Sequence, residues 1–221
     1  MPYFKNKDIN LLLIHIPKTG GTSLETYLSQ KYKIPLNNDS LSGFLNEDDN
    51  EIKNAKEKYQ IKSSMQHFTY KNILDLKNER IINIDFENNL KIVSIVRNPY
   101  TRIVSDLFTH FLINKNTSKE EVYHILCNNY IHSDKYDNHN LPQYSFLIDE
   151  NEKLLENITV FKTEILTESL INYGYQDFYV YLNKNYMSND YFSYLNKDSI
   201  RLINDFYSKD FKYFNYEKMI V

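Results

Sequence analysis

The sequence predicts an α/β fold in which helices flank a central parallel sheet, giving three layers. Three short apolar runs, at residues 11–16, 92–96 and 158–161, are bounded by polar or turn residues and are typical of buried parallel strands. Helical spacing of apolar residues follows the first two runs. A strand followed by a helix, repeated along the chain, indicates helices packed on a parallel sheet.

A helix is expected directly after each of the first two strands. Leu24, Tyr27 and Leu28 have helical spacing, and Thr22 or Ser23 is placed to cap the start of that helix. Pro99 suits the first turn of the second helix. The apolar stripe of the second helix consists of Ile103, Val104, Leu107, Phe108, Phe111 and Leu112.

The remaining chain completes what we predict to be one domain, residues 1–221. Residues 37–60 are polar and rich in Asn and acids, which indicates a surface insertion or a lid. Residues 118–155 look helical but irregular. The tail, residues 199–216, reads as an amphipathic helix running into an aromatic end, and its aromatic side chains are more typical of core than of a stacking surface.

Composition limits the possible partners and compartments. The net charge of −3 provides no global basic field for nucleic acid or an anionic membrane, so any anion site must be local. Cys127 is the single cysteine, which excludes an intrachain disulfide and fits a reducing compartment. The apolar run before His15 is too short for a signal peptide or a membrane span, so we expect a soluble, cytoplasmic protein without stable membrane insertion.

The stretch HIPKTGGTS, residues 15–23, places two of the four glycines of the chain side by side between a strand and a helix. Glycine permits positive φ, and a helix start offers unpaired N–H groups and a positive dipole end, so this joint predicts a phosphate or sulfate cradle. Lys18 adds a charge, and hydroxyl donors come from Thr19, Thr22 and Ser23. A P-loop kinase motif would place the lysine after the second glycine, whereas Lys18 precedes the pair. An ordinary glycine-rich turn is the remaining alternative.

A second anion site is predicted from IVSIVRNPYTRIVSDLFTH, residues 92–110. Arg97 ends a buried strand, while Arg102 and Ser105 lie three apart and share a helix face. A guanidinium binds phosphate through two N–H groups, and the serine hydroxyl adds a neutral donor. A surface ion-pair cluster is the alternative. Two anion sites in tandem α/β units suit a nucleotide with phosphates on both sides of its ribose.

Together these two motifs resemble those of the sulfotransferases that use 3′-phosphoadenosine 5′-phosphosulfate (PAPS), specifically the carbohydrate type that includes heparan sulfate 2-O- and chondroitin sulfotransferases. PKTGGTS is similar to the family's 5′-phosphosulfate loop, and RNPYTRIVSDL to its 3′-phosphate motif R-x-P-x-x-R-x-x-S. Residues 137–147, 160–166 and 203–216 extend the resemblance, although Lys162 stands where arginine is usual. The resemblance implies a P-loop-like three-layer fold.

The resemblance also implies roles for the motif residues. Pro17, Lys18 and the backbone of Thr19 to Ser23, including Gly20 and Gly21, would hold the phosphosulfate, and Lys18 would stabilise or protonate the bridging oxygen. The 3′-phosphate would bind Arg97 and Ser105, with Arg102 either joining them or making a structural ion pair. Positioning and electrostatics dominate such a transfer, so no metal is expected. PAPS and a hydroxyl acceptor, for which a glycan is the best guess, are the expected partners, with PAP as the product.

The acceptor hydroxyl needs a base, for which histidine is the natural residue near neutral pH. His67 lies in HFTY, which is similar to the H-x-x-[YF] segment that carries the family's catalytic histidine, so we predict it as the base. His15 is the main rival, but its position in a buried strand favours packing. His139, with Gln143, could line the acceptor side. Three further histidines in helical patterns are more typical of surface or helix packing: His110, His124 and His132.

Two other functions stay open at this point. One is an atypical P-loop nucleotide kinase, and the other is a non-catalytic PAP-binding module with the same fold. The sequence does not indicate the identity of the acceptor, the regiochemistry or the oligomeric state.

Overall fold

The computed structural model of the protein describes residues 2–37, 40–41, 50–179 and 190–221. Its sheet has four strands in the order β1-β2-β3-β4. The three predicted strands are confirmed and run parallel, with Leu12 beside Ile92 and Val93 beside Thr159. A short N-terminal strand that was not predicted adds antiparallel to β2, so the sheet is mixed rather than wholly parallel. The strands are β1 (Tyr3–Lys5), β2 (Asn10–Ile14), β3 (Lys91–Val96) and β4 (Ile158–Lys162).

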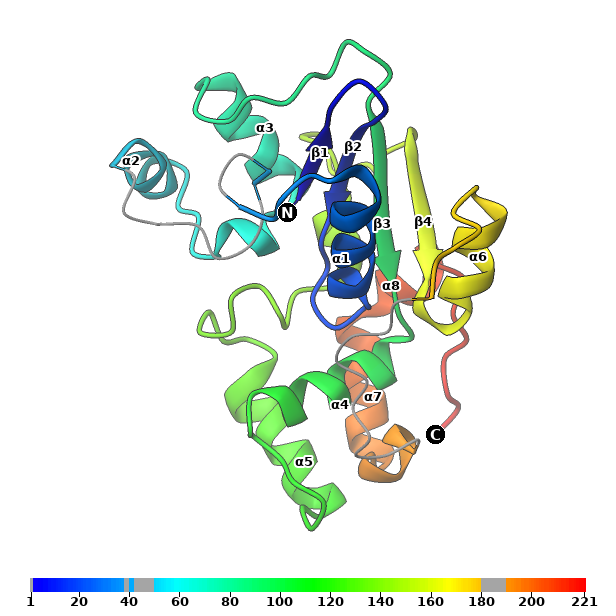
Figure 1. Ribbon diagram of the computed structural model, residues 1–221. Helices are drawn as coiled ribbons and strands as arrows, with labels where there is room; N and C mark the ends of the chain where they lie inside the picture. Colours follow the sequence, from blue (N-terminus) through cyan, green and yellow to red (C-terminus); the bar gives the residue numbers. More distant parts are fainter. Residues whose placement is uncertain (1, 38–39, 42–49, 180–189) are drawn as a thin grey trace.

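Helices α1 (Gly21–Tyr32) and α6 (Leu166–Asn172) pack on one face of the sheet. Alternate residues of a strand point to opposite faces, and Leu11 and Leu13 of β2 therefore join the same apolar cluster as Leu24 of α1. In Figure 1, α1 lies in front of β2 and β3, while α6 lies beside β4. This face is one of the predicted outer layers.

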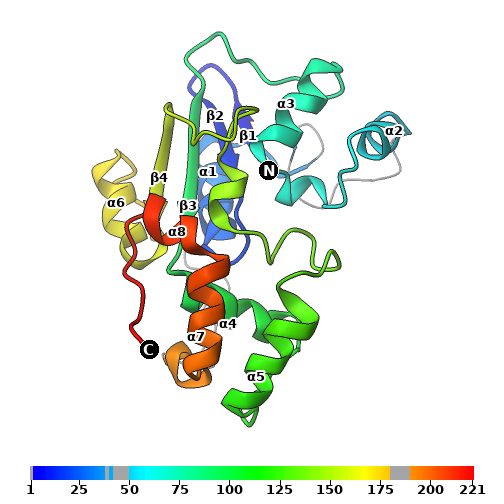
Figure 2. The same ribbon diagram turned by 180° about the vertical axis from the view of Figure 1, so that it is seen from behind.

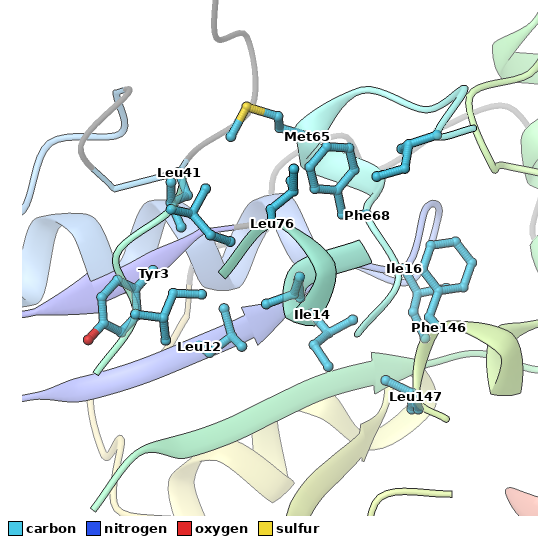
Figure 3. Close-up of a cluster of buried hydrophobic side chains, with 14 of the residues drawn as sticks. Tyr3, Leu12, Ile14, Ile16, Leu41, Met65, Phe68, Leu76, Phe146 and Leu147 are labelled. Atoms are coloured by element: carbon cyan, nitrogen blue, oxygen red, sulfur yellow. The ribbon is translucent and has the colours of Figure 1, made fainter. Parts of the chain in front are cut away.

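The other face of the sheet is covered by α3 (Tyr70–Asn78) and by a 3₁₀ turn, Gln143–Phe146. Figure 3 shows this cluster, in which Leu12 and Ile14 of β2 gather with Leu76 of α3 and with Leu147. Helix α2 (Asn50–Lys58) adds Ala55 from the periphery. Helix layers on both faces confirm the three-layer prediction.

A further group of helices packs around its own apolar cluster beyond the sheet. Figures 1 and 2 show α4, α5 and α7 at the end of the molecule toward which β3 and β4 point. Pro99 occupies the first turn of α4, as predicted. The irregular segment after α5 includes a π-helical turn, Leu126–Tyr130. The helices of this group are α4 (Pro99–Thr109), α5 (Lys119–Ile125), α7 (Lys197–Phe206) and α8 (Ser208–Tyr213).

Two sequence predictions about helices are wrong. The tail is not one helix, because the chain breaks at Tyr207 into α7 and α8. Neither Thr22 nor Ser23 caps α1, because both lie inside the helix and Gly20 occupies the N-cap position. The expectation that the tail aromatics form core is confirmed for Tyr207, Phe211 and Phe214, which are buried.

The stretch proposed as a surface insertion or lid, 37–60, is described in part, since residues 38–39 and 42–49 lie outside the described residues. Of the described part, Ser40 and Leu41 are buried, whereas residues 50–60 are mainly the exposed helix α2. The single-domain organisation and the lid both stay predictions. Within the described ranges, no helix is long and apolar enough to cross a membrane.

Candidate functional site

The predicted residues gather at the carboxyl edge of the parallel strands. Residues 16–23, which we call the glycine loop, follow β2, while Arg97 follows β3 and Thr163 follows β4. The Thr163 hydroxyl joins all three, because its oxygen lies 2.5 Å from the Thr19 carbonyl oxygen and 3.0 Å from that of Val96. Ligands of open α/β sheets bind at this edge.

The backbone carbonyls of the loop all have partners. Each of the five consecutive carbonyl oxygens from Ile16 to Gly20 accepts a hydrogen bond. The donors, in order, are Thr19 Oγ1 at 2.8 Å, Arg102 Nε at 3.0 Å, Arg97 Nη1 at 3.2 Å, Thr163 Oγ1 at 2.5 Å and Ser23 N at 3.1 Å. A trans peptide points its N–H opposite to its C=O, so the amides that follow are directed away from these donors. The loop therefore offers its N–H groups to an anion.

The two glycines are needed for different reasons. Gly20 has φ 97° and makes the left-handed turn into α1. Gly21 has ordinary helical geometry, but a Cβ there would lie 2.9 Å from Cδ2 and Nε2 of the His15 ring. Among the described residues, no side chain at the N-cap position closes the first turn of α1. The Ser23 amide is engaged by the Gly20 carbonyl, and the positive dipole end and the N–H groups before Ser23 face the loop.

The side chains of the loop are not equally available. Lys18 is half-buried and has φ 66°; burial lowers the pKa of its ammonium, with Arg97 acting in the same direction and Asp106 opposing. Thr19 is fully buried and its hydroxyl donates to the Ile16 carbonyl, so it is not a donor to an anion, in contrast to the prediction. Ser23 is buried in α1 and Thr22 is half-buried.

Arg97 is rigidly placed beside the loop. Its backbone exchanges two 2.8 Å hydrogen bonds with the Gln143 side chain, its Nε donates to Thr101 at 3.1 Å, and its guanidinium lies 5.0 Å from the centre of the Tyr191 ring. Gln143 is fully buried behind Arg97, so the expectation that it lines an acceptor site is wrong. Ser105 lies buried on α4, two turns beyond Arg97.

Arg102 has a different environment from that of Arg97. It is only 1% exposed and donates to three backbone carbonyls, those of Pro17, His139 and Leu141, at 2.7 to 3.0 Å. This pattern supports a structural role, in which Arg102 joins the glycine loop to the segment that carries His139. A structural role for Arg102 is thus favoured over binding of the 3′-phosphate. The three partners of Arg102 named above are carbonyls, whereas the sequence suggested an ion pair with an acid.

Four histidines form a row beside the loop. Ring centres are separated by 5.5 Å between His15 and His67, by 4.6 Å between His67 and His139, and by 4.8 Å between His139 and His110. All three contacts are edge-to-face. We call this arrangement the histidine row. It brings together the predicted base His67, its rival His15, His139, which was expected to line the acceptor side, and His110, which was expected among surface or packing residues.

Three members of the row are held through Nδ1 by carboxylates. His15 pairs with Glu25, His67 with Asp137 at 2.7 Å, and His139 with Asp106 at 2.6 Å. An Nδ1–H that donates to a carboxylate fixes the tautomer in which Nε2 carries the lone pair. Each of these rings is thus oriented to accept a proton at Nε2.

His67 ends a 3₁₀ turn, Met65–His67, and is 8% exposed. Burial lowers its pKa to about 4, with neighbouring His15 and His139 adding to the effect and Asp137 opposing it. Burial also raises the pKa of Asp137, but hydrogen bonds from His67 and Ser64 outweigh it and bring that pKa to about 2. The pair is a neutral imidazole beside a carboxylate at neutral pH.

The sequence reasoning missed the carboxylates of the row. Local spacing gives no signal for two of them, because Glu25 and Asp137 lie in different elements from the histidines that they hold. Asp106 is the exception, since it is an acid that lies four residues before His110, a spacing that places both on one face of a helix. Its carboxylate also accepts a hydrogen bond from the Tyr130 hydroxyl. His124 and His132 are exposed, as expected.

A cavity of about 330 Å³ opens beside Asp137, between residues 60–72 and 133–141. Amides, hydroxyls and two acids line most of it, and Lys62 in its wall pairs with Asp134 at 2.6 Å. In the same region, two trios of side chains have ligand atoms close enough to hold a metal ion: His67, Asp137 and His139, and Asp106, His110 and His139. The expectation that the protein uses no metal stays a prediction.

A glycine loop with engaged carbonyls, a strand-end arginine and a buried imidazole thus share one edge of the sheet. The chain was compared with known protein families, and the model of the sulfotransferase family matches residues 1–217. The protein belongs to the sulfotransferase family. This sulfotransferase is a PAPS-dependent transferase, which excludes the alternative of a nucleotide kinase. Searches of curated proteins and of solved structures gave no significant match.

Proposed function

We propose that this sulfotransferase moves the sulfuryl group of PAPS to a hydroxyl of a carbohydrate, with His67 as the base. The observation that carries the proposal is the pairing of His67 Nδ1 with Asp137 at 2.7 Å, which leaves Nε2 to accept the hydroxyl proton. A base held in one tautomer by a carboxylate is a recurring feature of sites that deprotonate hydroxyls.

The glycine loop is the proposed holder of the 5′-phosphosulfate. Its carbonyls are all engaged, so the amides of Lys18, Thr19, Gly20 and Gly21 and the start of α1 provide the anion site. Arg97 and Ser105 are the proposed partners of the 3′-phosphate. Arg102 supports the loop from behind through the Pro17 carbonyl.

Lys18 is proposed to act on the leaving phosphate. Charge builds on the bridging oxygen as the bond to sulfur breaks, and a poorly solvated ammonium attracts that charge more strongly than one in water. The lowered pKa of Lys18, which burial causes, also makes this ammonium a better proton donor to the oxygen. Lys18 therefore contributes more in the transition state than in the ground state.

A pKa of about 4 makes His67 a weak base in the free protein. The phosphosulfate donor is an anion, and a neighbouring negative charge favours the protonated form of an imidazole. Binding of PAPS is therefore expected to raise the pKa of His67 toward neutrality. Asp137 would then stabilise the imidazolium as the acceptor proton arrives.

His139 is the second candidate for the base. Its side chain is 14% exposed, against 10% for that of His67, and its Nδ1 is held by Asp106 in the same manner. His15 is a weaker rival, because its ring is closed in by Gly21 and is buried. The resemblance of HFTY to the family's histidine segment favours His67.

The cavity beside Asp137 supports a carbohydrate acceptor. Gln60, Asn72, Asn138 and Asn140 contribute amides, and serine and threonine hydroxyls complete much of the wall. Such groups match the hydroxyls of a sugar, which both donate and accept hydrogen bonds. Among the described residues that line it, none is arginine, so a neutral sugar fits better than a polyanionic one.

A transfer assay with radiolabelled PAPS tests this proposal. We expect label to move to neutral glycans in preference to phenols and lipids. Gln60→Ala should raise the KM for the glycan without changing PAP affinity, whereas Asn151→Ala, at an exposed position outside the cavity, should change neither. Transfer to phenols or lipids alone would overturn the choice of acceptor.

A further inference from the structure

We propose that Asp106, His110 and His139 form a binding site for a divalent transition-metal ion, with Zn²⁺ as the best match. Asp106 and His110 lie one turn apart on α4 and its C-cap, and His139 approaches from another segment. One ligand atom from each residue lies within 4.8 Å of the others. Two imidazoles and one carboxylate make a donor set that Zn²⁺ commonly takes, with a fourth position open.

The nitrogen of His110 supplies the decisive observation. Its Nε2 is buried and has no hydrogen-bond partner among the described residues, which is an unfavourable state for a polar atom. It lies 3.5 Å from Asp106 Oδ2, too far or too poorly aligned for a hydrogen bond. Two ligands on one tetrahedral ion with bonds of 2.0–2.1 Å are about 3.3 Å apart. The observed separation therefore suits a shared ion better than a shared proton.

Only a small movement is needed to complete the trio. The Nδ1 of His139 lies 2.6 Å from Asp106 Oδ1, so this contact would open to about 3.3 Å as the ion replaces the proton between them. His139 changes tautomer in this step: Nδ1 gives up its proton and binds the ion through its lone pair, while Nε2 takes up a proton, so the ring stays a neutral imidazole. Spacing of two ligands by four residues on one helix also places them on the same face.

The electrostatics of Asp106 are compatible with a cation. The carboxylate is 1% exposed, and its pKa is lowered by His139, Tyr130 and His110 despite its burial. The Asp106 charge also favours the ammonium form of Lys18. A bound ion would neutralise part of that charge, so metal binding would act on the group proposed to meet the leaving phosphate.

The other trio, His67, Asp137 and His139, fits an ion less well. His67 and Asp137 already satisfy each other with a 2.7 Å hydrogen bond, and Ser64 donates twice more to the same carboxylate. Within the described part of the chain, that trio contains no buried nitrogen without a hydrogen-bond partner. The proposed site is therefore the trio of Asp106, His110 and His139, which does not include His67, the proposed base.

Metal titration of the chain without a histidine tag tests the site. We expect one Zn²⁺ per chain, measured by competition with a chromogenic chelator, and a four-coordinate ligand-field spectrum with Co²⁺. His110→Gln should weaken Zn²⁺ binding at least tenfold, whereas His132→Gln, at an exposed histidine, should leave it unchanged. In the wild-type chain, Zn²⁺ should shift the imidazole NMR signals of His110 and His139, a readout that does not depend on the folding of a variant.

Three results would overturn the proposal. They are absence of Zn²⁺ binding by the wild-type chain, equal binding by His110→Gln, and loss of binding in His67→Gln with retention in His110→Gln. The last result would assign the ion to the other trio. None of these measurements uses transfer activity, so failure here is distinct from failure of the proposed function.

Discussion

The glycine loop and the histidine row lie together at one edge of the sheet, but they are built in different ways. The loop is formed by consecutive residues, whose carbonyls from Ile16 to Gly20 are engaged, although three of the five donors come from 79 to 144 residues away. The row is a long-range structure, because His67 and Asp137 are 70 residues apart and His139 and Asp106 are 33 apart. Arg102 contacts both, through the carbonyls of Pro17 and His139.

This difference separates two kinds of chemistry. In the proposed mechanism, the loop acts through backbone dipoles, whose charge does not change with pH, and through the ionisable side chain of Lys18. The row acts through imidazoles, whose protonation depends on burial and on neighbouring carboxylates. We therefore expect changes in the loop to affect the donor and the leaving group, and changes in the row to affect proton transfer.

The largest effect is expected from Lys18→Ala. Turnover should fall on the order of 10³-fold, because one charged donor to the developing negative charge is removed. The Kd for PAP should rise much less, since the contact strengthens only as the phosphate gains charge. Initial rates and PAP titration measure the two quantities, with Lys7→Ala as an exposed control. Near-normal turnover would refute the role of Lys18.

Asp137→Asn should lower turnover on the order of 10²-fold, because the amide keeps the shape but no longer stabilises an imidazolium. Asp137 opposes the lowering of the His67 pKa, so its removal should shift the base limb of the pH–rate profile to lower pH. A profile from pH 4 to 8 measures this shift. An unchanged limb would show that Asp137 does not act on the base.

Arg97→Ala should raise the Kd for PAP about tenfold to a hundredfold, the usual loss for a hydrogen bond between charged groups. Arg102→Ala should instead lower the melting temperature, because three carbonyls lose a buried partner. Arg201→Ala, whose side chain is exposed beside Asp198, is the control. If Arg102→Ala weakens PAP binding with no loss of stability, the structural role is wrong.

The smallest effect concerns stability and pH. His67 has a folded-state pKa of about 4, below the 6.5 of an unfolded histidine, so the unfolded chain binds more protons between these values. The free energy of unfolding should therefore fall as pH is lowered through this window, by about 1–2 kcal/mol between pH 6.5 and 5 from this group. Urea unfolding at both pH values measures it, and His67→Asn should reduce the difference. An equal difference in His67→Asn would contradict the assignment.

The loop was more accessible to sequence reasoning than the row. The strand ends, the glycine pair, Lys18 and Arg97 follow from neighbours a few residues apart, and the structure places them as a strand–loop–helix joint. The roles predicted for the Thr19 hydroxyl and for Gln143 are wrong, because they depend on the direction in which a side chain points. The Thr19 hydroxyl donates to the Ile16 carbonyl, and the Gln143 side chain bonds to the Arg97 backbone at the end of a strand. Glu25, Asp137 and the orphan nitrogen of His110 became visible only through tertiary contacts. The sequence predicted His67 through a family resemblance rather than through its partner.

The central claim is that the loop binds the donor while His67 activates the acceptor. The most direct test is His67→Ala, with the PAP Kd and the single-turnover transfer rate measured on the same preparation. The account predicts an unchanged Kd and a transfer rate lower by roughly 10²- to 10⁴-fold, the usual contribution of a general base. His132→Ala should match the wild type. Full transfer activity in His67→Ala, with loss of activity in His139→Ala or in a stably folded His15→Ala, would contradict the account and move the base along the row.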